Sequence, residues 1–168
     1  MLVKRLLAGG FTVALLGATV VLAPSPAEAS TSGSCWDYKR AERLFARKIN
    51  RARSRADRVR LHLDPQLSQV ARKHASAMSS KQSLYHDTQA LRRRVTRWQA
   101  LGENVGAGSG TTSIHRAFMR SAGHRYNILW REFRHVGVGV RRSAGRMWVT
   151  VVFESRVNPG TTLPPPSC

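Results

Sequence analysis

The stretch VGVGV, residues 136–140, alternates a branched apolar residue with glycine. A period of two is typical of a β-strand, in which successive side chains point to opposite faces of a sheet. The valines would enter a core, and the glycines on the other face indicate that another part of the chain packs closely over the strand. A turn follows at 143–145, and residues 146–154 are again rich in Val, Trp and Phe. The two segments therefore predict a β-hairpin.

The segments before this hairpin have the helical period of 3.6 residues. The clearest helix begins after Asp64 and Pro65, which suit an N-cap and a first turn. Its apolar stripe includes His74, for which a hydrogen-bonded place in the core is the expected role and a ligand role is the alternative. The other members of the stripe are Leu67, Val70, Ala71, Ala75 and Met78.

Further helical segments surround this one in the chain. They are predicted over 37–53, over 89–98 with Leu91, Val95 and Trp98 inward, and from Thr112 or Ser113 onward with Ile114, Ala117 and Phe118 inward. Helices followed by a hairpin indicate an α+β domain, in which helices cover a mostly antiparallel sheet.

Residues 1–29 have the three-part pattern of a secretory signal peptide. Lys4 and Arg5 precede an apolar run, and Ala27-Glu28-Ala29 is typical of a cleavage site. An uncleaved membrane anchor is the alternative, because the run is nearly long enough to span a bilayer. The Ala-x-Ala ending favours cleavage, so we expect a secreted protein with no stable membrane span afterwards.

The remaining chain divides into an N-terminal segment over 30–39, one domain over 40–156 and a Pro/Thr-rich tail over 157–168. The two cysteines, Cys35 and Cys168, stand near the two ends. In an oxidising compartment the simplest arrangement is one disulfide between them, and unpaired or intermolecular thiols are the alternative.

The chain is strongly basic, with a formal net charge of +19, and it keeps +18 without the predicted signal peptide. This charge favours anionic envelope polymers, acidic lipid surfaces or nucleic acid as partners. The alternative is a scattered, solvated set of cations, and the basic residues between 47 and 60 favour it because they fall on all sides of their segment. Only Arg92–Arg94 with Arg97 and Trp98 forms a local patch, and specific nucleic-acid binding is not expected.

A glycine-rich run, LGENVGAGSG at 101–110, contains the single carboxylate Glu103. Its glycines lack the spacing and the lysine of a phosphate-binding loop, so nucleotide binding is not expected. Glu103, His86 and His124 all fall in expected loops or at element edges, where their side chains are free to converge. They can supply three ligands to Zn²⁺ with a place left for water, or form a His-Glu-His cluster without a metal. The spacing does not decide between these arrangements.

The order of several motifs resembles the CAP superfamily, also called SCP or cysteine-rich secretory protein/antigen 5/pathogenesis-related 1, in its compact bacterial form. The resemblance covers about residues 40–154. Its motifs are Ile49-Asn50-x-x-Arg53, Leu67-x-x-Val70-Ala71-x-x-His74-Ala75-x-x-Met78, Tyr85-His86, Gly102-Glu103-Asn104-Val105, Ser121-x-Gly123-His124-Arg125-x-Asn127-Ile128-Leu129 and Phe133-x-x-Val136-Gly137-Val138-Gly139.

This resemblance implies a three-layer α-β-α sandwich, an extracellular location and a surface cleft with two histidines and two glutamates. His86, Glu103 and His124 match three of these four positions. Ser121 stands at the position nearest to the second glutamate, which puts any activity needing the full set in doubt. Zinc can still use three protein ligands and a water.

The neighbours of these residues have expected roles as well. Glu103 is expected to be held by glycine-permitted turns, facing both histidines. Asn104 and Asn127 are expected to brace the local backbone, and Arg125 is a candidate for an anionic ligand at the cleft rim.

The leading hypothesis is a secreted, non-enzymatic CAP module. Its cleft would bind a metal ion, with zinc as the candidate cofactor, or a small or lipidic ligand at the cell envelope or outside the cell. One alternative is an extracellular hydrolase that uses zinc-bound water, or Ser121 activated by a histidine. Another is a polyanion-binding adhesion protein that acts through charge. The missing second acid and the absence of a GxSxG elbow favour binding over catalysis.

Overall fold

The computed structural model describes residues 36–155 of the chain. The predicted signal peptide, the predicted Cys35–Cys168 disulfide and the Pro/Thr-rich tail lie outside these residues. The described elements are, in chain order, α1 (Arg40–Ser54), β1 (His62–Leu63), α2 (Pro65–Lys81), α3 (Thr88–Arg94), β2 (Leu101–Gly108), α4 (Thr111–Arg120), α5 (Ala122–Leu129), β3 (His135–Ser143) and β4 (Arg146–Glu154).

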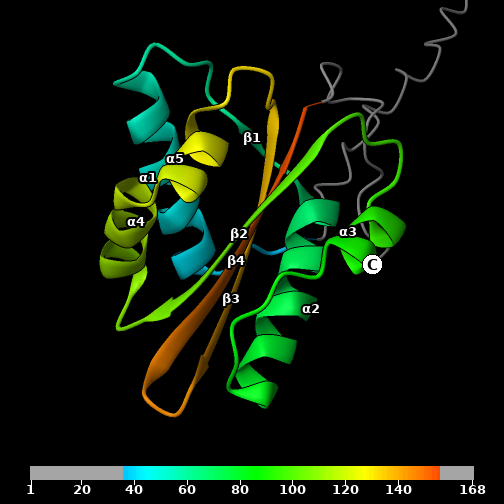
Figure 1. The fold of residues 1–168 in the computed structure, drawn as a ribbon, viewed down its shortest axis with the longest axis vertical. Helices are drawn as coiled ribbons and strands as arrows, with labels where there is room; N and C mark the ends of the chain where they lie inside the picture. Colours follow the sequence, from blue (N-terminus) through cyan, green and yellow to red (C-terminus); the bar gives the residue numbers. More distant parts are fainter. Residues whose placement is uncertain (1–35, 156–168) are drawn as a thin grey trace, which may run out of the picture. The chain divides into compact units, whose positions relative to one another are not determined.

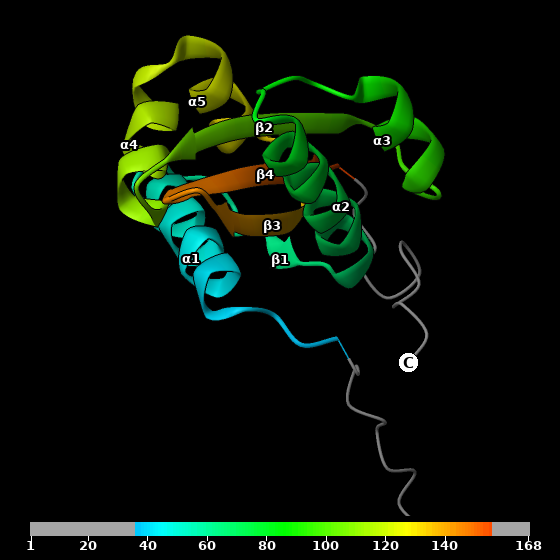
Figure 2. The same ribbon diagram turned by 90° about the horizontal axis from the view of Figure 1, so that it is seen from below.

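The strands form one sheet in the order β1-β3-β4-β2. β1 runs parallel to β3, whereas β3–β4 and β4–β2 are antiparallel. Helices α1, α4 and α5 cover one face of the sheet, and α2 and α3 cover the other (Figures 1 and 2). The predicted α+β class and three-layer α-β-α sandwich are therefore confirmed. Within the described residues no helix has the length and apolarity needed to cross a membrane.

The glycines of VGVGV permit α2 to lie directly on β3. A Cβ atom at Gly137 would lie 2.1 Å from the carbonyl carbon of Leu67, and one at Gly139 would lie 2.1 Å from that of Ala71. The intervening valines point to the opposite face, where they join a core with Phe45 and other side chains. The prediction that another segment packs closely over this strand is confirmed.

The hairpin and α2 also agree with their predictions. The turn between β3 and β4 uses a positive φ at both Ala144 (48°) and Gly145 (70°). Asp64 is the N-cap of α2, and its carboxylate accepts a hydrogen bond from the backbone N–H of Leu67 at 2.9 Å. Pro65 then occupies the first turn, where its missing N–H has no cost.

Three expectations about the helices are wrong. The first helix begins at Arg40 rather than at residue 37. α3 ends at Arg94 because Val95 has an extended conformation, and Trp98 beyond it is 38% exposed rather than inward. On α4, Ile114 and Phe118 are buried but Ala117 is exposed, because only the former two face the core.

Arg53 corrects the expectation that the basic residues of α1 are all solvated. Its side chain is fully buried, and its guanidinium donates to four backbone carbonyls. The acceptors are the oxygens of Val59 (2.7 Å), Ile128 (2.8 Å), Trp130 (2.9 Å) and Phe133 (3.3 Å). Burial lowers the pKa of Arg53 to about 10, with a smaller effect from neighbouring arginines. The guanidinium thus stays charged at neutral pH and ties α1 to the segment that follows α5.

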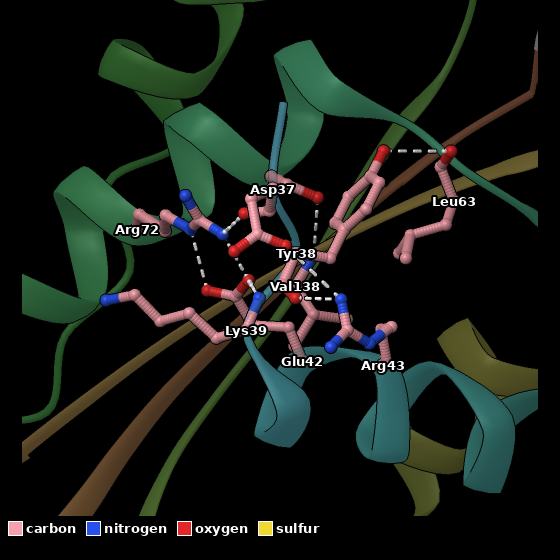
Figure 3. A network of polar contacts seen from close by, with 9 residues as sticks. Asp37, Tyr38, Lys39, Glu42, Arg43, Leu63, Arg72 and Val138 are labelled. Carbon is pink, nitrogen blue, oxygen red and sulfur yellow. Dashed lines mark hydrogen bonds and ion pairs between the residues drawn. The ribbon is translucent and has the colours of Figure 1, made fainter. Parts of the chain in front are cut away.

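A second buried charge joins helices on opposite faces of the sheet. Glu42, in the first turn of α1, has no exposed surface and pairs with Arg72 of α2, whose Nε lies 2.7 Å from Oε1 (Figure 3). The backbone N–H of Lys39 donates to the other carboxylate oxygen at 2.9 Å. The start of α1 is therefore held to α2 by a paired and hydrogen-bonded carboxylate, which is the arrangement that burial of a charge requires.

Candidate functional site

Glu103 lies on β2, where it pairs with Val152 of β4, and not in a loop as expected. Its side chain is only 4% exposed. Oε1 lies 2.7 Å from Nδ1 of His74, and Oε2 lies 2.8 Å from Nδ1 of His86. An ionised carboxylate only accepts hydrogen bonds, so it favours the tautomer with the proton on Nδ1 in both rings. Each Nε2 is then left as an acceptor or a metal ligand.

His74, on α2, is buried as its place on the apolar stripe predicts. The ring is 5% exposed, and the ring of Tyr85 packs against it edge-on with centroids 4.9 Å apart. Its Nε2 has no hydrogen-bond partner among residues 36–155. Sequence reasoning did not connect His74 with Glu103. The signal was present, because the one ionisable group on an apolar stripe needs a buried polar partner.

His86 lies between α2 and α3, and its side chain is 51% exposed. It is therefore the outer histidine of the pair that Glu103 holds. The expectation that Glu103 faces His86 agrees with this geometry. The second carboxylate oxygen, however, goes to His74 rather than to His124.

His124 lies on α5, and its ring packs on Phe118 of α4 with centroids 4.7 Å apart. Partial burial lowers its pKa, and the charge of His86 lowers it further. No hydrogen bond joins the ring of His124 to that of His86 in the described part of the chain.

Two asparagines connect β2 to α5, as their expected bracing role requires. Asn104 is fully buried, and its amide donates to the backbone oxygen of His124 at 3.0 Å. Asn127 donates to the backbone oxygen of Glu103 at 3.1 Å and to Oδ1 of Asn104 at 2.9 Å. The positions of Glu103 and His124 are therefore coupled through side chain–backbone hydrogen bonds.

A groove of about 300 Å³ opens beside His124. Its walls are mostly apolar, and Ser121 and His124 are its polar members. Arg125 does not line this groove but a separate pocket on the outer side of α5. The remaining lining residues of the groove are Leu84, Val105, Gly106, Ala107, Ile114, Ala117 and Phe118.

The described residues do not form the expected three-ligand metal set. Among the described residues, no group of three or more His, Cys, Asp or Glu side chains is placed to hold a metal ion. Both oxygens of Glu103 are engaged by histidines. The donor atoms that remain in the site are Nε2 of the buried His74 and ring nitrogens of His86 and His124. The rings of His86 and His124, which are less buried, suit Zn²⁺ but provide only two protein ligands.

The fold and site define a class of small α-β-α proteins with histidines gathered around a buried glutamate on an edge strand of the sheet. The family model described as the cysteine-rich secretory protein family, CAP, matches residues 46–153. The chain belongs to this family.

Individual relatives agree with this assignment. The chain is 29% identical over 140 residues to the uncharacterized protein YkwD of Bacillus subtilis, which covers 77% of this chain and 54% of YkwD. An extracellular SCP-domain protein of Bacillus anthracis has a similar structure, with a TM-score of 0.63 and 27% identity over 69% of this chain and 40% of that one. The chain thus spans about half, or less, of these relatives. NaASP2, solved with Zn²⁺, shares the fold at 16% identity and a TM-score of 0.54, over 69% of this chain and 80% of that one.

Proposed function

We propose that this chain is an exported, non-enzymatic CAP protein whose His86 and His124 bind a divalent metal ion, with Zn²⁺ as the leading candidate. Export is supported by the signal-peptide pattern of residues 1–29. It is also supported by the extracellular description of the Bacillus anthracis relative.

The contact of Glu103 with His86 carries the metal proposal. A metal-binding histidine usually donates its second ring N–H to a carboxylate, which fixes the ring and makes the other nitrogen a better ligand. Glu103 is this carboxylate for His86: its Oε2 lies 2.8 Å from Nδ1 of the ring, and its own side chain is buried. In this proposal Glu103 orients a ligand and does not bind the metal. The zinc in the NaASP2 structure is supporting evidence at the level of fold.

The electrostatics of His124 also support metal binding. A neutral imidazole is required for coordination, and burial keeps the pKa of His124 below its usual range. With only two protein ligands, the remaining coordination positions would be taken by water or by a second ligand. The bound ion would therefore exchange more readily than one in a closed structural site.

Hydrolysis is a weaker proposal because the groups for it are not arranged. Ser121 is the N-cap of α5, and no histidine donates to it or accepts from it among the described hydrogen bonds. Glu103 is already engaged by two imidazoles. His124 lines the groove, but no hydrogen bond among the described residues joins its ring to Ser121 or to Glu103.

The test is a zinc titration by calorimetry on the chain as it is secreted by an expressing bacterium, with its N-terminus determined by mass spectrometry. One-to-one binding is expected for the wild type, and its loss is expected in His86→Ala/His124→Ala. The matched control is His62→Ala, which removes an exposed histidine on β1. Binding that survives the double substitution would refute the proposal.

A second candidate function is the binding of a small lipidic ligand in the groove beside His124. The apolar walls favour it, because they leave an unpaired apolar surface next to two polar groups. Ala117→Trp would fill the groove from α4, whereas Arg116→Trp adds the same ring on that helix outside the groove. Binding of a fluorescent fatty acid should be lost in Ala117→Trp and kept in Arg116→Trp. Equal binding by both variants would exclude the groove as the lipid site.

A further inference from the structure

Helix α5 has a second face, which points away from Glu103 and His124. On this face Ala122, Arg125, Tyr126 and Leu129 recur at i, i+3, i+4 and i+7, which places them in one stripe. The side of the helix that faces the core carries the fully buried Ile128. The stripe forms one wall of a pocket of about 390 Å³, which Arg58, Trp130 and Arg131 complete.

The pocket contains two aromatic side chains, of which Tyr126 is exposed and Trp130 is half-buried. Tyr126 is 62% exposed and stacks on Trp130, with ring centroids 6.4 Å apart and planes inclined by 24°. Trp130 in turn packs edge-on against Phe133, with centroids 4.5 Å apart. Because Phe133 belongs to the core, the aromatic pair is held in place from below. An ordered, exposed tyrosine on such a support is typical of a binding surface.

The arginines give the pocket a positive charge. Arg58 is held in its wall, since its Nε donates to the backbone oxygen of Leu129 at the end of α5, at 3.1 Å. Arg125 and Arg131 are exposed. No carboxylate lines the pocket, although Asp57 and Glu132 neighbour Arg58 and Arg131 in the chain. Val59, which follows Arg58, is also 62% exposed.

We propose that this face of α5 docks the protein on an anionic phospholipid membrane. Guanidinium groups bind phosphate through paired hydrogen bonds, and basic residues near an anionic bilayer contribute about 1 kcal/mol each. Tyrosine and tryptophan prefer the headgroup region, where the ring is in an apolar layer and its polar end meets water. The pocket combines both features on one helix face. This role is separate from ligand binding in the groove beside His124.

The aromatic residues favour a membrane over a soluble polyanion. A flexible polyanion is attracted by charge, and other basic segments such as Arg92–Arg94 on α3 offer that equally well. Trp98 beside Arg92–Arg94 is 38% exposed, but its indole N–H is bonded to the backbone oxygen of Arg92 at 3.2 Å, and no second aromatic ring stacks on it among the described residues. Dependence on Tyr126 therefore distinguishes insertion into a bilayer from attraction by charge.

The experiment uses the secreted chain and vesicles of phosphatidylcholine, with and without phosphatidylglycerol, and measures cosedimentation. Arg125→Gln/Arg131→Gln is expected to weaken binding to the anionic vesicles by roughly 10- to 30-fold. Arg92→Gln/Arg93→Gln removes the same charge from α3 and should weaken it by less than about threefold. Equal losses in the two double variants would overturn the proposal, because the charge would then act from the whole surface.

Tyr126→Ser supplies the second arm. The substitution keeps every charge, and Tyr126 is exposed, so the unfolding transition should be unchanged. Binding to anionic vesicles should fall by about threefold to tenfold, the amount expected for an interfacial aromatic ring, while retention on soluble polyphosphate stays the same. Vesicle binding that is unchanged by Tyr126→Ser would overturn membrane docking and leave a soluble polyanion as the partner of this face.

Discussion

Oε1 of Glu103 and Nδ1 of His74 lie 2.7 Å apart, and both side chains are at least 95% buried. This contact joins β2, at the edge of the sheet, to the helix α2 that covers one face of the sheet. The same carboxylate holds the half-exposed His86 through its other oxygen. Glu103 therefore connects the hydrophobic core with the solvent-facing part of the site.

The two histidines should contribute unequally to stability. His74→Ala leaves a buried carboxylate oxygen without its donor and opens a cavity, so we expect a loss of about 2–4 kcal/mol in the free energy of unfolding. His86→Ala exposes the other oxygen to water and should cost less than about 1 kcal/mol. Urea denaturation of both variants at neutral pH measures the difference. Equal losses would show that burial of the His74 contact does not matter.

The glycines of β3 provide a test of the packing of α2. Gly139→Ala would place a methyl group 2.1 Å from the backbone of Ala71. To relieve this clash, either β3 or α2 would have to shift its backbone, which is costly in a packed core. We expect a loss of more than about 3 kcal/mol, or failure to fold. Gly123→Ala, where nothing lies within 4 Å, is the matched control and should be neutral or slightly stabilising. A fully stable Gly139→Ala protein would mean that α2 does not lie on this strand.

The parts of the fold with a strong local pattern could be predicted from the sequence. The VGVGV alternation indicates both the strand and the close approach of another segment, since glycine on one face of a strand has few other uses. Asp64 and Pro65 likewise mark the start of α2. The prediction that Trp98 points inward is wrong because α3 ends at Arg94, one turn earlier than expected. The extended backbone of Val95, which ends the helix, leaves no sign in the apolar periodicity.

The candidate site was predicted less completely, because its geometry depends on contacts between distant segments. The pairing of Glu103 with His86 could be expected from the family resemblance. The apolar stripe indicates that His74 needs a buried polar partner, but to identify Glu103 as that partner requires knowing that its side chain points to the face of the sheet that α2 covers. Arg53 is similar, because a cation surrounded by carbonyl groups has no complementary acid in the sequence to indicate its burial.

Arg53 should be among the most sensitive positions of α1. Arg53→Lys keeps the charge but cannot reach four carbonyl groups with one ammonium, so buried acceptors lose their donors. We expect a loss of about 3 kcal/mol or more. Arg51→Lys, at an exposed position of the same helix, should change stability by less than about 0.5 kcal/mol. Chemical denaturation compares the two, and a similar small effect at both positions would contradict the role of the buried guanidinium.

Asp64 should make the protein less stable as the pH rises from acid to neutral. Burial raises its pKa to about 6, against the opposing effect of the N–H groups that it caps, and Glu154 adds a smaller increase. Between about pH 4 and about pH 6, Asp64 therefore holds a proton in the folded state that it has lost in the unfolded state. The contribution of Asp64 to the free energy of unfolding is highest below that pH range and falls by up to about 3 kcal/mol across it.

Asp64→Asn isolates this effect, because asparagine also caps helices well but does not titrate. The variant should gain stability over the wild type at about pH 7 and lose that advantage at about pH 4, where Asp64 is protonated in the folded protein. Asp87→Asn makes the same exchange at the N-cap of α3 and controls for loss of a capping carboxylate. Urea denaturation across this pH range gives the difference between variant and wild type. A difference that is constant with pH would show that Asp64 has the same pKa in the folded and unfolded states, so that its hydrogen bonds to the start of α2 fully offset the loss of water.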